Sequence, residues 1–146
     1  MKNTIKAEGT FTWKVIEEAT GKVVETFSEK NMVVLIGKTN LTKLIGGDAA
    51  GKAVTQVSVG TNGTDPALSD NAITSAFTKN IDSVSYPDAS SVEFNFTILG
   101  TEANGMTIRE AGLILADNTL FARKTRADFA KTSANKLVGT WIIKFI

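Results

Sequence analysis

The sequence has 146 residues, a formal net charge of +1, and neither cysteine nor histidine. Without these two residue types the chain can form no disulfide, no thiolate nucleophile, no serine–histidine pair and no zinc site of the usual ligand kind. Its length matches one compact domain, and 42% apolar with 21% charged residues is the balance of a soluble globular protein. The longest apolar run, Met32–Ile36, is too short for a membrane span, and we expect no export signal.

Charge is distributed unevenly along the chain. Residues 101–146 carry a surplus of +3, whereas the first hundred residues carry −2. Nucleic-acid-binding proteins concentrate far more positive charge on one face, because neutralised phosphates supply most of their affinity. We therefore expect no nucleic-acid partner, and we interpret the basic segment as a solvated or subunit-facing surface.

The N-terminal part of the sequence predicts a hairpin, one helix and a short strand. Thr4–Glu18 alternates apolar and polar residues, which predicts a half-buried strand, and a turn then leads to a second strand over Val23–Phe27. Apolar residues next recur every three to five positions, which predicts a helix over Val34–Ile45 that stops at Gly46. After a loop, Val54–Val59 predicts another strand.

Turn residues dominate Thr61–Pro66 and predict a surface loop, and Ser69–Asn71 could cap a brief helical turn that reaches Phe77. Further strands are predicted over Ile81–Tyr86, Val92–Ile98, Thr107–Leu115, Asn118–Lys124 and Leu137–Phe145. About eight short strands and one helix predict a mainly β fold. We expect a single-domain β-sandwich or jelly-roll-like structure over residues 1–146, with one short α-helix.

The last predicted strand is apolar on both faces, with Leu137 and Trp141 on one and Val138 and Ile142 on the other. This pattern is typical of a central strand or of one covered by a neighbouring subunit. Most aromatic residues alternate with Val and Ile, as in a sandwich core: Trp13, Phe94, Phe96, Phe121, Trp141 and Phe145. The less periodic aromatic residues are better candidates for surface anchors: Phe77, Tyr86 and Phe129.

No motif for catalysis or for metal binding is convincing. Gly46–Ala53 approximates a phosphate-binding loop, but alanine stands at the hydroxyl position, and the segment follows a helix instead of a strand. Asp65, Asp70 and Asn71 could supply oxygens to calcium, but their spacing matches no EF-hand, so we interpret them as turn residues. We expect no catalytic residue, no cofactor and no metal, and therefore no enzyme.

Two stretches carry a resemblance to a known class of protein. The chain has an I-x-E-x-G-L strand, an L-F-A-R strand and a closing W-x-I-x-F strand in that order. This order resembles small structural virion proteins of tailed bacteriophages, including capsid decoration (cement) proteins and tail or baseplate fibre domains. The first stretch contains the segments Glu29–Val34, Val57–Gly63 and Thr64–Asp70. The second contains Ala103–Leu115, Asn118–Arg123 and Val138–Phe145.

The resemblance implies a jelly-roll-like domain that works by assembly, without catalytic residues. Because the sequence has no coiled-coil stalk or collagen-like repeat, it favours a capsid decoration protein that binds the exterior of the head shell and stabilises it. The alternative is a tail or baseplate fibre module that recognises a host surface through the loops Thr61–Asp70 and Gly100–Gly105.

The expected partners are the major capsid protein or other virion proteins, and further copies of the chain in a homo-oligomer (dimer or trimer). We expect neither nucleic acid nor a membrane as a partner, and we expect the virion as the location, after assembly in the cytoplasm of the bacterial host.

Four residues of the basic segment are predicted contacts to a neighbouring subunit: Arg123, Lys124, Arg126 and Phe129. Mixed charge beside an aromatic anchor is typical of an interface core and its rim. The alternative for Arg109 and Glu110 is a structural ion pair between them.

Overall fold

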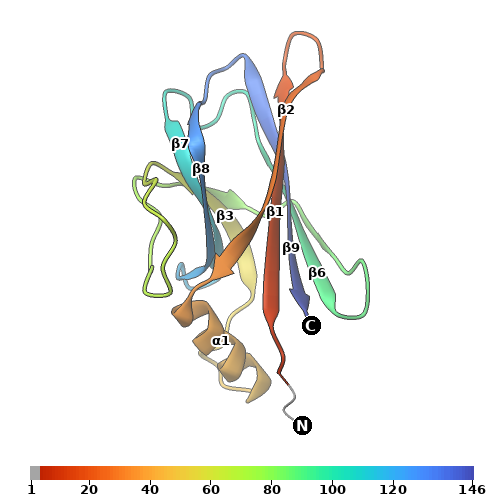
Figure 1. Cartoon of the computed structure of the whole chain (residues 1–146), viewed down its shortest axis with the longest axis vertical. Helices are drawn as coiled ribbons and strands as arrows, with labels where there is room; N and C mark the ends of the chain where they lie inside the picture. The colour runs from red at the N-terminus through yellow and green to blue at the C-terminus, as the bar shows by residue number, and fades with distance from the viewer. Residues whose placement is uncertain (1–3) are drawn as a thin grey trace. The chain divides into compact units, whose positions relative to one another are not determined.

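The computed structural model describes residues 4–146, which are mainly β with one short helix (Figure 1). All strand pairs are antiparallel, and the predicted mainly β class with one helix is confirmed. The chain divides into two compact units built from interleaved segments. The first unit contains residues 4–31, Ile81–Asn104 and Thr132–Ile146, and the second contains Met32–Asn80 and Gly105–Lys131. The single-domain organisation stays a prediction.

The first unit is an antiparallel sheet in the order β2-β1-β9-β6-β5. Its strands are β1 (Ala7–Glu17), β2 (Val23–Val33), β5 (Ser83–Ser85), β6 (Ser91–Ile98) and β9 (Asn135–Phe145). The last strand of the sequence is central, as predicted, because β9 pairs with β1 on one side and with β6 on the other.

Aromatic side chains form the core of the first unit. The ring of Phe11 lies 5.5 Å from Trp13, 4.7 Å from Trp141 and 6.0 Å from Phe96, measured between centroids. Both indoles are fully buried, and Nε1 of Trp141 donates a hydrogen bond of 2.8 Å to Oδ1 of Asn31. Edge-to-face and offset pairs of this kind contribute beyond the area that they bury. The predicted aromatic core is confirmed for Trp13, Phe94, Phe96 and Trp141.

Phe145 is an exception to the predicted core. Its side chain is 38% exposed, because it lies at the end of β9, opposite Ala7, where β1 begins. Tyr86, a predicted surface residue, is 75% exposed and lines the same shallow pocket as Phe145.

Gly139 on β9 packs closely against a buried aromatic ring. A Cβ atom at this residue would lie 2.0 Å from Cζ of Phe96, so the buried ring would have to shift. We expect Gly139→Ala to lower the free energy of unfolding by about 1–3 kcal/mol, measured by urea denaturation. Gly46→Ala is the matched control, because its Cβ would meet nothing closer than 3.4 Å. An equal loss in both variants would contradict the close packing.

The second unit contains a sheet in the order β4-β3-β7-β8, and the last two residues of β2 pair with β8. Its strands are β3 (Val54–Gly60), β4 (Phe77–Asn80), β7 (Thr107–Leu115) and β8 (Leu120–Ala130). The predicted helical turn from Ser69 to Phe77 is wrong. The carboxylate of Asp70 binds other groups, and Phe77 begins β4, which pairs with β3.

The helix α1 (Leu35–Ile45) is confirmed, but its buried residues are Gly37 and Asn40 rather than its apolar ones. A Cβ atom on Gly37 would lie 2.3 Å from the carbonyl oxygen of Phe121, so only glycine allows this approach to β8. The amide of Asn40 binds both the N–H and the carbonyl of Lys52. Close backbone approach and a polar side chain therefore hold the helix.

Candidate functional site

Two opposite charges lie on the same buried face of neighbouring strands in the second unit. The side chain of Glu110 on β7 is 0% exposed, and that of Arg123 on β8 is 2% exposed. Arg123 lies opposite Gly112 in the ladder, and Glu110 lies two residues before that glycine, so both side chains share one face. Nε of Arg123 donates to Oε1 of Glu110 at 2.9 Å.

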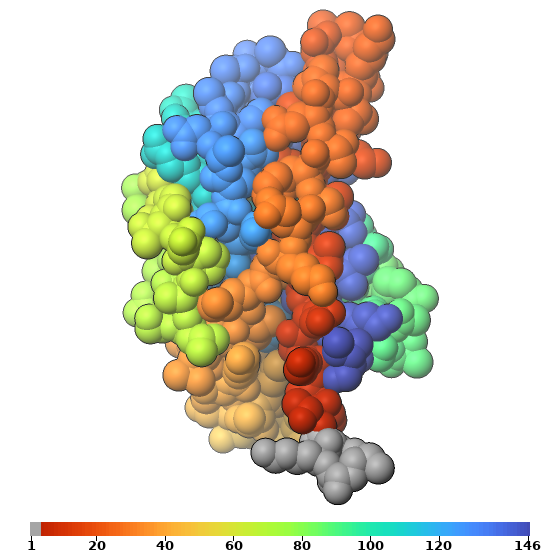
Figure 2. Space-filling view, in the orientation of Figure 1, coloured from red at the N-terminus to blue at the C-terminus, as the bar shows by residue number. Residues whose placement is uncertain are grey.

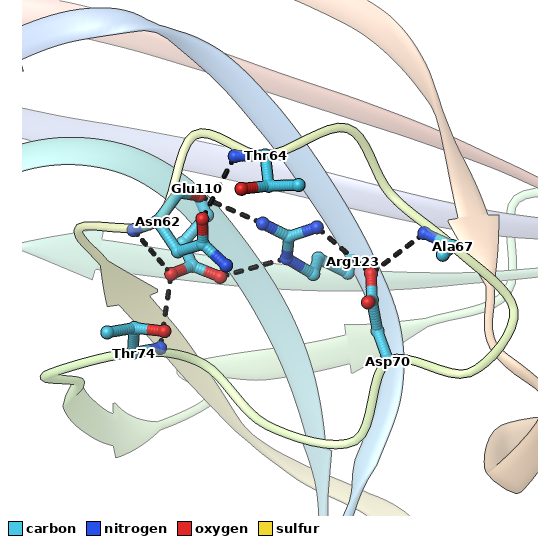
Figure 3. A network of polar contacts seen from close by, with 7 residues as sticks. All are labelled: Asn62, Thr64, Ala67, Asp70, Thr74, Glu110 and Arg123. Carbon is cyan, nitrogen blue, oxygen red and sulfur yellow. Dashed lines mark hydrogen bonds and ion pairs between the residues drawn. The ribbon is translucent and has the colours of Figure 1, made fainter.

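The other nitrogens of the Arg123 guanidinium bind the loop between β3 and β4 (Figure 3). Nη1 donates to Oδ2 of Asp70 at 2.9 Å, and Nη2 donates to the carbonyl oxygen of Asn62 at 2.9 Å. The guanidinium thus joins two carboxylates and a backbone carbonyl. Charge-assisted bonds of this geometry are the strongest that a side chain makes.

The second carboxylate oxygen of Glu110 binds the same loop from its other side. Oε2 accepts hydrogen bonds from the backbone N–H of Asn62 at 2.7 Å and of Thr74 at 3.1 Å. The backbone N–H of Thr61 also donates to the carbonyl of Thr74 at 3.1 Å, which closes the loop at its base. We call these five residues the clamp: Asn62, Asp70, Thr74, Glu110 and Arg123.

The clamp fixes the loop of residues 61–74, which contains no helix or strand. Within this loop, Oδ2 of Asp70 also accepts from the N–H of Ala67, and Oδ1 of Asn62 accepts from the N–H of Thr64. The yellow-green loop lies at the surface in the space-filling view (Figure 2). Its side chains are presented to solvent from a backbone that buried charges hold in one conformation.

The clamp is suited to positioning and not to chemistry. Both carboxylate oxygens of Glu110 and three guanidinium nitrogens of Arg123 are bound to protein groups. Buried ion pairs of this kind give specificity of conformation more than stability, since desolvation offsets most of the attraction. This arrangement therefore presents no reactive group to a substrate.

A second, exposed ion pair supports the same loop. Nε and Nη2 of Arg109 bind the two carboxylate oxygens of Asp128 at 2.8 and 3.2 Å, and Nη1 donates to the carbonyl of Thr61 at 3.3 Å. The predicted ion pair between Arg109 and Glu110 is wrong. Adjacent residues of a strand point to opposite faces, so each side chain pairs on its own side of β7.

Asp128 is expected to titrate below the ordinary aspartate value. The hydrogen bond from Arg109 lowers the pKa of Asp128 from 3.8, and the same bond raises the pKa of Arg109. The stabilisation by this pair is therefore fully present above pH 3.8 and is lost as the pH falls through the lowered pKa of Asp128. Carboxyl-carbon NMR measures this midpoint.

Arg109→Gln is expected to move the pKa of Asp128 back towards its ordinary value. Lys144→Gln removes a different surface cation, which lies beside Asp88, and is the control. A midpoint at the ordinary value in the unaltered protein would contradict the pairing.

The four predicted interface residues have different environments in the structure. Arg123 is 1% exposed and bound within the clamp, so its prediction as a surface contact is corrected. The guanidinium of Arg126 lies over the ring of Phe129, with its central carbon 5.3 Å from the centroid. Lys124 is half-buried on the same strand. For Lys124, Arg126 and Phe129, contact with another subunit stays a prediction.

The loop Gly100–Gly105, the other loop predicted to recognise a host surface, has hydrogen bonds of its own. Oε1 of Glu102 accepts from the N–H of Leu99 at 2.8 Å, and Nδ2 of Asn104 donates to the carbonyl of Gly100 at 2.9 Å. At the end of this loop, the backbone N–H of Gly105 donates to the carbonyl of Lys131 at 3.0 Å.

Sequence reasoning missed the clamp, although the sequence contains a signal for it. Glu110 directly precedes the apolar stretch Ala111–Leu115, and Arg123 directly follows the apolar stretch Leu120–Ala122. A tight turn joins these stretches, so opposite charges on their buried faces could have been expected to meet.

No protein-family model matches the sequence, and no curated protein and no solved structure matches it significantly. The arrangement of the clamp is therefore interpreted from its own geometry.

Within residues 4–146, no three acidic side chains come together as a possible metal site. In the same part of the chain, no helix is long and apolar enough to cross a membrane. In the glycine-rich loop after α1, Nζ of Lys52 donates to the carbonyl of Ala49, and Oδ1 of Asp48 accepts from the N–H of Ala50. The lysine that a phosphate loop would direct at an anion binds this loop instead.

Proposed function

We propose that this chain is a non-enzymatic structural protein of a tailed-phage virion, and that it decorates the exterior of the head shell. The observation that carries the proposal is that the motif residues on which the resemblance rests bind other parts of the same chain. Glu110 and Arg123 hold a loop, and Trp141 bonds to Asn31 within an aromatic core. Motif residues with these roles build a rigid scaffold, as expected of a protein that works by assembly.

Exposed apolar side chains supply candidate contact surfaces for assembly. In the first unit these include Val84, Tyr86, Val138 and Phe145, and in the second unit they include Leu35, Ile36 and Leu68. Apolar side chains surrounded by polar ones are typical of protein interfaces. A partner that binds only the assembled shell raises the stability of that shell by mass action.

The first test uses purified protein and expanded heads that lack it. We expect the protein to cosediment with the heads and to raise their melting temperature. Arg126→Glu is expected to weaken binding if the basic end of β8 faces a neighbour, and Lys38→Glu on α1 is the control with the same charge change. Failure of the unaltered protein to cosediment would refute decoration.

The second candidate is a tail or baseplate module that recognises a host surface, and the clamp favours it. A loop that is already ordered loses little conformational entropy when it binds a partner. Gold-labelled antibodies against the chain, applied to intact virions, distinguish the two candidates: label on the head supports decoration, and label on the tail supports host recognition. Virions without the chain would refute both.

A further inference from the structure

A pocket of about 390 Å³ lies on the second unit, beside the clamped loop. It opens between the loop that precedes β4 and the face of the sheet that carries Ser58 and Leu120. None of the clamp residues lines it, so it is a separate feature of this unit. Its volume is in the range of pockets that hold small molecules.

The floor of the pocket is apolar and rigid. Ile114 and Leu120 are 7% and 1% exposed, lie opposite each other on β7 and β8, and pack with Val34 and Ile73. Ile73 lies over Gly112, where a Cβ atom would come within 2.8 Å of its side chain. The floor is therefore held in place by the core of the unit.

The polar lining is uncharged and has free hydrogen-bonding capacity. Gln56 on β3, Asn71 in the loop and Asn118 in the β7–β8 turn contribute amide side chains. None of these three amides has a hydrogen-bond partner among residues 4–146. Ser58 and Thr78 add two hydroxyls, which bond to each other across neighbouring strands.

We propose that this pocket binds a neutral sugar ring. Each amide is both donor and acceptor, which matches a sugar hydroxyl that is both at once. The apolar floor matches the C–H face of a pyranose ring. A ligand with hydroxyls can therefore bond to these amides while its apolar face covers the floor.

The same lining disfavours other small ligands. Among the lining residues, all of which lie within the described part of the chain, none is charged, so a phosphate or a carboxylate would lose water without gaining a counter-charge. No aromatic ring lines the pocket, and a nucleobase would therefore have no stacking partner. This ligand class goes beyond the structural role proposed above and does not depend on it.

The test is an NMR titration of the whole ¹⁵N-labelled chain with glucose, galactose and N-acetylglucosamine, each to about 50 mM, a range that detects millimolar affinity. We expect one or more of these sugars to shift the side-chain amide signals of Gln56, Asn71 and Asn118, and glucuronate to leave them unchanged. Titration with the methyl glycoside and with a disaccharide of the same sugar shows whether the pocket accepts a free sugar only or also one linked in a glycan.

Asn71→Ala is expected to weaken the affinity by about three- to tenfold, the loss of one hydrogen bond. Asn95→Ala on β6 removes an amide outside the pocket and is the matched control, expected to leave the affinity unchanged. The absence of shifts with every neutral sugar would overturn the proposal. So would equal shifts with glucuronate, or shifts that persist unchanged in a Gln56→Ala/Asn71→Ala/Asn118→Ala variant shown by its backbone spectrum to be folded.

Discussion

Replacing Arg123 with methionine is expected to lower the free energy of unfolding by about 3–5 kcal/mol, the usual loss when one partner of a buried ion pair is removed. Methionine keeps much of the volume but leaves the buried carboxylate of Glu110, and the carboxylate of Asp70, without the cation that both bind. Urea denaturation measures the change in stability. Amide hydrogen exchange at Asn62 and Thr74 is expected to become faster, because these N–H groups bind Glu110.

A double variant tests the cause of this loss. The double variant Arg123→Met/Glu110→Leu removes both buried charges, and we expect it to recover part of the stability that Arg123→Met loses. Amide hydrogen exchange in the loop of residues 61–74 is expected to stay as fast as in Arg123→Met. Lys30→Met breaks an exposed ion pair with Glu8 and is expected to cost less than about 1 kcal/mol. Equal losses for Arg123→Met and Lys30→Met would show that the clamp contributes no more than a surface pair.

Replacing Trp141 with alanine is expected to lower the free energy of unfolding by about 3–5 kcal/mol, as for other fully buried aromatic residues. The indole is 0% exposed and contacts Phe11 at the centre of the aromatic cluster. Thermal denaturation followed by circular dichroism measures the loss.

Trp141→Phe separates packing from hydrogen bonding. Phenylalanine keeps an aromatic ring but loses the bond to Asn31, and we expect a loss of about 1–3 kcal/mol. Because the chain has two tryptophans, this variant leaves Trp13 as its single indole and allows fluorescence to follow unfolding. If Trp141→Phe loses as much stability as Trp141→Ala, the hydrogen bond and not the packing would dominate at this position.

The predictable part of the fold was the part with a clear hydrophobic period. The strand over Val92–Ile98 and the helix near Val34–Ile45 were predicted within one residue of their bounds, because apolar residues alternate in the first and recur every three to five positions in the second. The four-residue strand Phe77–Asn80 was missed. It has too few residues to show a period, and its position depends on pairing with β3.

The candidate site was less predictable, because its contacts join residues far apart in the sequence. The residues around Asp70 predict a helix cap, but its carboxylate instead binds Arg123, which lies 53 residues away in the sequence. In the same way, the sequence around Arg123 predicts a surface cation, whereas the pairing of β8 with β7 buries its side chain against Glu110. Local sequence shows which side chains carry charge, whereas the register of the sheet decides which of them meet.

The central place of β9 in the first unit has a consequence for the order in which that unit can form during synthesis. Its neighbours β1 and β6 are made earlier, but neither can complete the sheet until Asn135–Phe145 arrives to join them. The sheet strands of the second unit, by contrast, are all present once Ala130 has been made. Synthesis therefore favours folding of the second unit first. The aromatic residues of β1 and β6 cannot be buried together until Trp141 has been made.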